Sequence, residues 1–107
     1  MSVVETYEID GIAVDDGTLH LMISDHLDWE DEAVHLSLLQ DKLNAYAHFY
    51  ISKQYKKVCP KERVRSCCIH IYCMYELSEK GNSFIGTARE QLRKKHITIE
   101  VVFEGES

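Results

Sequence analysis

The sequence predicts an α+β domain, in which two helices cover one face of a four-stranded, mixed or antiparallel sheet as a two-layer sandwich. Three observations predict this class. Apolar and polar residues alternate in the first quarter of the chain, apolar residues then recur every three or four positions, and a strand–helix–strand pattern follows. The predicted order is β-β-α-β-α-β. A chain of 107 residues is expected to form a single domain, residues 1–107 with an ordered core over 5–104.

The first two strands are predicted as a hairpin. Residues 6–14 read as a strand with an irregularity at Asp10-Gly11, where the apolar phase slips. The sequence "DDG" at 15–17 is typical of a turn, because Asp tolerates and Gly favours left-handed backbone geometry. Residues 18–24 alternate regularly and form the second strand.

A long helix is predicted over residues 29–52, because one apolar stripe recurs at helical spacing. Its members are Leu36, Leu39, Leu43, Tyr46 and Tyr50. A second stripe lies about 130° round the axis. It consists of Val34, Leu38, Ala45 and Phe49. One sheet cannot bury both stripes, so either the second helix covers this flank or a partner does.

The rest of the chain alternates strand and helix. Residues 53–65 contain Pro60 and read as a solvated connection. A strand is predicted over 64–77, a helix over 83–95 and a last strand over 97–104. The residues expected to face the core from the two strands are Cys67, Ile69, Ile71, Cys73, Tyr75, Ile97, Ile99, Val101 and Phe103.

Composition narrows the function classes. The net charge is −6, from 18 acidic residues against 12 Lys and Arg, so a nucleic-acid partner is not expected. No stretch approaches the roughly 18 apolar residues that cross a membrane, and Met1–Asp10 lacks the basic start of a signal peptide. We therefore expect a cytoplasmic protein with reduced cysteines and no cofactor.

The stretch "SDHLDWEDEAVH", residues 24–35, gathers acids, histidines and a tryptophan. We interpret it as a helix start, with Asp28 as N-cap and Asp31 at the third helical position. Two alternatives stay open. A metal could bind His26, Asp31 and His35, with Asp25 as a further ligand, or Trp29 could belong to a surface that contacts a partner.

The sheet face away from the predicted core is the second candidate site. It carries residues that are unusual on a solvated sheet. They are His20, Met22, Cys68, His70, Tyr72 and Met74. We interpret them, together with Trp29, as a partner-binding surface, against the alternative of scattered surface apolar residues.

A thiol enzyme is the rival hypothesis for that face. Cys68 and His70 lie about 7 Å apart along one strand, and His20 joins them if its strand is adjacent. The sequence offers no evident Asn or Asp to orient the histidine, so we do not assign a Cys-His catalytic dyad. A zinc site built from cysteines is not expected either, since Cys67 and Cys68 point to opposite faces and there is no CxxC motif.

Two blocks carry a resemblance to a known family. "ISDHLDW" (Ile23–Trp29) and "HLSLLQDKLNAY" (His35–Tyr46) resemble the hallmark of a bacterial family of small proteins with a domain of unknown function. The resemblance covers nearly the whole chain and implies a hairpin, long helix, strand, helix and strand. Members often have Ser-Gly-Gln at the end of the long helix, where this chain has Ser52-Lys53-Gln54. It implies no activity and no catalytic residues.

The sequence thus predicts a non-catalytic protein that acts by protein–protein interaction, with another protein or with a second copy of itself as the partner. One alternative is an immunity-type inhibitor whose acidic surface blocks a basic toxin. The other is a small metal-dependent enzyme built on Asp25, His26, Asp31 and His35.

Overall fold

The computed structural model describes residues 9–104 and confirms the predicted fold class and element order. The predicted residues 6–8 of the first strand, and residues 5–8 of the predicted core, lie outside this range. The elements are β1 (Gly11–Asp15), β2 (Thr18–Asp25), α1 (Glu32–Ile51), the short 3-10 helix η1 (Gln54–Lys57), β3 (Ser66–Cys73), α2 (Glu79–Arg93) and β4 (Ile97–Phe103).

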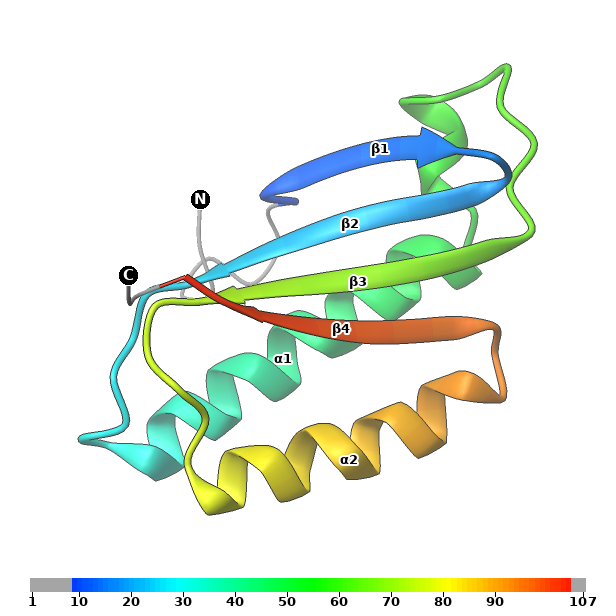
Figure 1. Cartoon of the computed structure of the whole chain (residues 1–107). Coiled ribbons are helices and arrows are strands. Elements are labelled where there is room, and N and C mark those ends of the chain that lie inside the picture. The colour runs from blue at the N-terminus through cyan, green and yellow to red at the C-terminus, as the bar shows by residue number, and fades with distance from the viewer. Residues whose placement is uncertain (1–8, 105–107) are drawn as a thin grey trace.

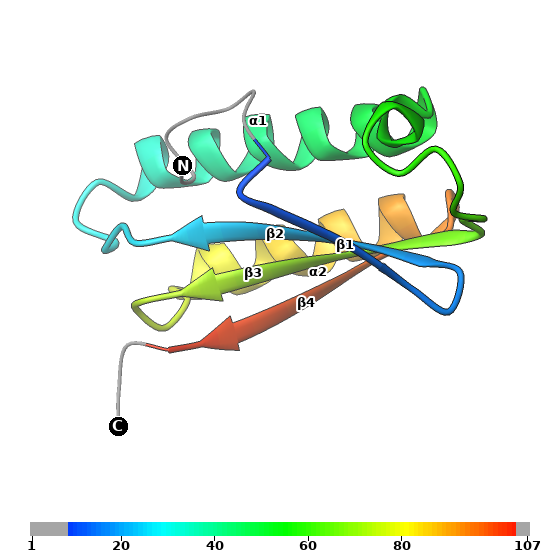
Figure 2. The ribbon, with the colours of Figure 1, turned by 90° about the horizontal axis from the view of Figure 1, so that it is seen from above.

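The sheet is mixed, with strand order β1-β2-β3-β4. β1 and β2 pair antiparallel, whereas β2, β3 and β4 pair parallel, so their arrowheads point the same way in Figure 2. Each parallel step needs a crossover helix, and crossovers of one hand that advance in one direction place their helices on the same face. Figure 1 accordingly shows α1 and α2 together on one side of the sheet.

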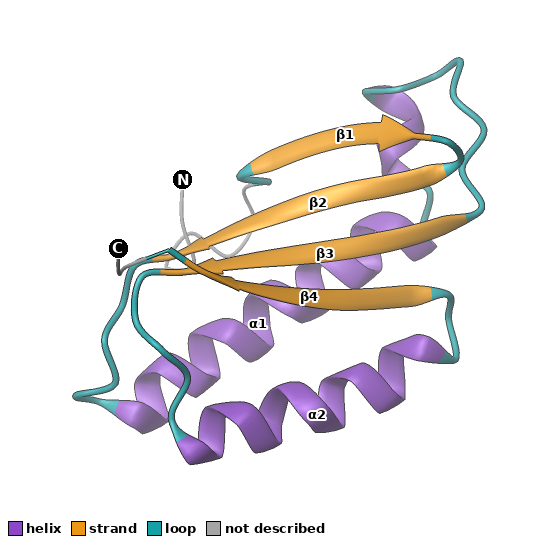
Figure 3. Cartoon of the chain, in the orientation of Figure 1, coloured by secondary structure: helices purple, strands orange, loops and turns teal. Residues whose placement is uncertain are grey.

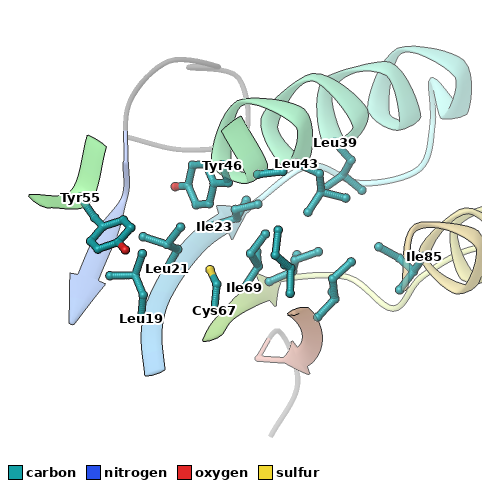
Figure 4. Packing of buried hydrophobic residues seen from close by; sticks show 14 of the residues in the cluster. Leu19, Leu21, Ile23, Leu39, Leu43, Tyr46, Tyr55, Cys67, Ile69 and Ile85 are labelled. Atoms are coloured by element: carbon teal, nitrogen blue, oxygen red, sulfur yellow. The ribbon is translucent and has the colours of Figure 1, made fainter. Parts of the chain in front are cut away.

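The core lies between the sheet and the helices. Leu19, Leu21 and Ile23 alternate along β2 and are fully buried. Figure 4 shows Leu39, Leu43 and Tyr46 of α1 facing these strand residues, with Ile85 from α2 beside them. Burying each large aliphatic side chain stabilises the fold by about 1.5–3 kcal/mol. The other strand residues of the buried hydrophobic core are Cys67, Ile69, Ile71, Cys73, Ile97 and Ile99.

The start of α1 differs from the prediction. The N-cap is Asp31, whose Oδ1 accepts a hydrogen bond from the Val34 backbone N–H at 3.3 Å. The assignment of Asp28 as N-cap was wrong, because its Oδ1 accepts from the Glu30 N–H at 3.1 Å and closes a turn before the helix. Asp28 and Asp31 are both residues of a type preferred at the N-cap, and the sequence alone did not decide between them.

β3 is shorter and α2 longer than predicted. β3 ends at Cys73, so Tyr75 lies beyond it and is 47% exposed instead of facing the core. α2 begins at Glu79, because Ser78 is a good N-cap that accepts from the Gly81 N–H at 3.0 Å. Gly81 lies in the first turn of this helix, ahead of the predicted start at residue 83. It allows close packing, since a Cβ there would lie 2.9 Å from a ring carbon of Trp29.

One further apolar prediction needs correction. Phe103 is the last residue of β4, an edge strand with a single neighbouring strand, and it is 42% exposed where a core position was predicted. In the second stripe of α1, Leu38 and Phe49 are half-buried and pack against the core, whereas Val34 is 51% exposed.

α1 ends at Ile51, one residue before the predicted end. Two residues after the end of α1, Lys53 has φ +62°, in the left-handed region that favours glycine. This is the position at which the family resemblance implies a glycine. Lysine therefore adopts a conformation here that costs a residue with a Cβ about 1–2 kcal/mol.

The N-cap assignment makes a stability prediction. Asp31→Ala should lower the free energy of unfolding by about 0.5–2 kcal/mol, because the Val34 N–H loses its acceptor. Asp28→Ala should cost less, since Asp28 closes a turn outside the helix. Urea denaturation of the two variants measures both, and a larger loss for Asp28→Ala would contradict the assignment.

The left-handed residue makes a second prediction. Lys53→Gly should raise the free energy of unfolding by about 0.5–1 kcal/mol, the relief of strain less the greater freedom of glycine in the unfolded chain. Lys57→Gly is the matched control, because Lys57 lies in η1 with negative φ. This substitution relieves no strain and should therefore lower the free energy of unfolding. Equal effects of both substitutions in urea denaturation would refute the strain argument.

Candidate functional site

Two polar clusters qualify as candidate sites, one inside the molecule and one on the sheet. The inner cluster joins the end of β2 to the first turn of α1. Asp25 and His35 are both 2% exposed, and the His35 Nε2 lies 2.6 Å and 2.8 Å from the two carboxylate oxygens of Asp25. The Trp29 ring stacks on the imidazole, with 3.7 Å between the ring centroids.

Both ring nitrogens of His35 are engaged. The Nδ1 lies 2.9 Å from the backbone carbonyl oxygen of Asp28, which can only accept, so Nδ1–H donates to it. A proton must therefore also lie between Nε2 and the carboxylate of Asp25. That carboxylate further accepts from the Leu27 N–H at 3.2 Å. Every polar side-chain atom of the pair has a partner within the protein, and the pair fastens α1 to the sheet.

The predicted metal set is not assembled. Asp25 and His35 pair with each other, Asp31 caps α1, and His26 is exposed in the loop. Figure 3 places this loop, between β2 and α1, at the same end of the sheet as the loop between β3 and α2. Within residues 9–104, a single group brings three or more His, Cys or acidic ligand atoms within 4.8 Å of one another. It contains none of these four residues.

The second cluster lies on the side of the sheet that carries neither helix, which we call the helix-free face. Strand register assigns its positions, because residues opposite each other in neighbouring strands share a face. They are Gly11, Ala13 and Asp15 of β1, Thr18, His20, Met22 and Ser24 of β2, Ser66, Cys68, His70 and Tyr72 of β3, and Thr98, Glu100 and Val102 of β4. The predicted His20, Met22, Cys68, His70 and Tyr72 thus do share one face. Met74 follows the end of β3 and is 50% exposed.

Three of these residues converge. His20 and Cys68 are partners across the parallel β2–β3 pair, and His70 lies two residues further along β3. The His20 Nδ1 is 2.8 Å from the His70 Nε2, and one ring nitrogen of each histidine lies with the Cys68 Sγ in the group whose atoms are within 4.8 Å of one another. The His70 Nδ1 is 3.7 Å from a carboxylate oxygen of Glu100 on β4. Sequence spacing linked Cys68 to His70, but only the pairing of β2 with β3 adds His20.

Burial raises the pKa of the three cysteine thiols on β3. Burial raises the pKa of Cys67 and of Cys73 to about 12. The pKa of Cys68 is also raised, first by burial and then by the Glu100 carboxylate, against a lowering by the Thr98 hydroxyl. A nucleophilic cysteine needs the opposite shift. The geometry therefore gives no support to a Cys68–His70 catalytic dyad acting without another activating group.

The larger surface grooves lie elsewhere. One, of about 680 Å³, is lined by residues of α1 with Ile9 and Gln54. None of the predicted site residues lines it. No helix in the described part of the chain is long and apolar enough to span a membrane.

Comparison with known proteins identifies the family. The sequence matches DUF6572, a family of unknown function, over residues 1–105. Since the match covers nearly the whole chain, the protein belongs to this family, which agrees with the resemblance of its two sequence blocks. No curated protein and no solved structure matches the chain.

The buried pair predicts a large stability effect. His35→Ala should lower the free energy of unfolding by about 3–5 kcal/mol, because it leaves the Asp25 carboxylate buried without its partner. His26→Ala, an exposed histidine in the same segment, is the control and should change stability by less than about 0.5 kcal/mol. Guanidinium or urea denaturation compares them, and a cost for His35→Ala as small as the control's would show that the pair is not the fastening we describe.

Proposed function

We propose that this DUF6572 domain acts without catalysis, by protein–protein interaction through its helix-free face, and that its partner is a second copy of the chain. The observation that carries the proposal is the composition of this face. Of the fourteen positions that strand register assigns to it, Asp15 and Glu100 alone carry a carboxylate and none carries Lys or Arg. A solvated antiparallel or mixed sheet face normally carries many more charged side chains.

The surface continues at one end of the sheet. Tyr72 and Val102 are partners there. Just beyond the end of β3, Met74 is 50% exposed and Tyr75 is 47% exposed. Aromatic residues and methionine are the residue types enriched in protein interfaces. Exposed apolar side chains that gather in one place favour an interaction site over scattered surface residues.

Charge favours a second copy over a basic partner. The chain has a net charge of −6, so two copies repel each other at long range unless they meet where acids are scarce. The helix-free face is such a place. An immunity-type inhibitor would instead meet a basic toxin with an acidic surface, and the exposed acids Asp28, Glu30 and Asp31 lie in the loop before α1, off this face.

Self-association is tested by light scattering after size-exclusion chromatography, over a concentration series and with a chelator present. The mass should rise with concentration towards twice the 12.4 kDa of the chain. Tyr72→Lys should weaken the dimer at least about tenfold, because it places a charge in an aromatic contact. Val34→Lys is the matched control, an exposed apolar residue on α1. A monomer at every concentration, or equal weakening by both variants, would overturn the proposal.

A further inference from the structure

We propose that His20, Cys68 and His70 form a binding site for one zinc ion on the helix-free face. The inference goes beyond the proposed function and does not rest on it, since all three ligands come from one chain. It starts from the donor set, which combines two imidazole nitrogens and one thiol sulfur. Zinc takes this mixture of His and Cys ligands readily, whereas magnesium and calcium prefer oxygen.

The distances fit a tetrahedral ion. Zinc bonds of about 2.0–2.3 Å separate two ligand atoms by roughly 3.3–3.8 Å. The three donor atoms already lie within 4.8 Å of one another, and the His20 Nδ1 and His70 Nε2 are 2.8 Å apart. The nitrogens need to separate by a few tenths of an ångström while the sulfur draws in. Rotation of the side chains provides such shifts without moving the strands.

Zinc binding displaces the proton that lies between the two histidine nitrogens. Two imidazole nitrogens at hydrogen-bond distance share one proton, which one donates and the other accepts. Zinc displaces this proton, which moves to the other nitrogen of the same ring, and it displaces the proton of the Cys68 thiol, which is released to water. The ion then receives lone pairs from two neutral imidazoles and one thiolate. In the balance the chain loses one proton and gains a doubly charged cation.

Glu100 is a second, independent observation that points to a metal ligand. Its carboxylate oxygen lies 3.7 Å from the His70 Nδ1. A carboxylate facing that nitrogen favours the tautomer with the proton on Nδ1, which leaves the lone pair on Nε2, the atom that lies 2.8 Å from the His20 Nδ1. A histidine whose second nitrogen faces a carboxylate is the recurrent arrangement of zinc ligands.

The sheet supplies rigid positions for these ligands. His20 and Cys68 are partners across parallel strands, and Cys68 is also the partner of Thr98 on β4. The thiol thus lies on β3, the inner strand between β2 and β4. Ligand residues on strands hold their donor atoms in more precise positions than ligand residues on loops. Three protein ligands leave a fourth position for water or another small ligand on the helix-free face, as in zinc sites that remain open.

Cobalt titration of the full-length, metal-free chain tests the site. Co²⁺ should bind with one equivalent and give the intense visible bands of a tetrahedral ion together with a thiolate-to-cobalt charge-transfer band in the near ultraviolet. Zn²⁺ should then bleach both. Absence of these bands in the wild-type chain would overturn the proposal without recourse to any variant.

Variants assign the ligands. Cys68→Ser should abolish the charge-transfer band, and His20→Ala and His70→Ala should each weaken Zn²⁺ binding at least about a hundredfold. Glu100→Gln should weaken it about 10–100-fold, as loss of a partner of a metal-bound histidine does. Far-ultraviolet circular dichroism confirms that each variant is folded.

Two controls use the half-buried Cys59 and the exposed His26. Cys59→Ser and His26→Ala remove a thiol and an imidazole outside the cluster and should leave binding unchanged. A charge-transfer band that survives Cys68→Ser or disappears with Cys59→Ser would refute the assignment. The outcome is separate from that of self-association, because zinc binding by a monomer would support the site while refuting the dimer.

Discussion

The parallel register of β3 between β2 and β4 is the constraint on which the described structure depends. Because each parallel neighbour is reached through a helix, the chain must cross over twice, and both crossovers lie on one side of the sheet. This covers one face with both helices and leaves the other without a helix. The same register aligns His20 with Cys68 and Met22 with His70. The covered core and the candidate surface are thus two consequences of one pairing pattern.

Two buried polar contacts hold α1 to this sheet. Near its start, His35 pairs with Asp25 at the end of β2. Further along, the fully buried Lys42 lies 3.2 Å from Asp10, whose other carboxylate oxygen accepts from the Ser24 N–H at 3.0 Å. Isolated buried charges are too costly to persist, so each of these four groups requires its partner. The contacts therefore specify where α1 lies along β2, which apolar packing alone leaves less defined.

Tyr46 extends the second contact. Its hydroxyl donates to the Met22 carbonyl at 2.6 Å and accepts from the Asp10 N–H at 2.9 Å, and burial raises its pKa. The sequence showed only a phase slip at Asp10-Gly11, which predicted an irregularity without its cause. The cause is that Asp10 turns inward to meet α1 before β1 begins. A contact between residues 36 positions apart leaves no trace in local periodicity.

Local patterns predicted what local physics determines. Alternation identified the strands, three- and four-residue spacing identified α1, and the parity of the strand positions placed Cys68, His70 and Tyr72 on one face. The N-cap of α1 was predicted wrongly, because Asp28 and Asp31 can each cap a helix and the local sequence does not decide between them. The start of α2 was predicted at residue 83 instead of Glu79, because the role of Gly81 in this helix depends on Trp29, a residue distant in sequence. The meeting of His20 with Cys68 and His70 required strand order, which the sequence left open.

The two proposals share a face, and their electrostatics are connected. A zinc ion held by one thiolate adds a single positive charge to the helix-free face, because the ion carries two and the thiolate removes one. On a chain of net charge −6, that change reduces repulsion where two copies would meet. The ion's open coordination position also lies on that face, so a dimer would have to leave room for its fourth ligand or supply it. Zinc would therefore alter the strength of self-association even though each can occur alone, and the direction of the change reports whether the metal lies inside the contact or beside it.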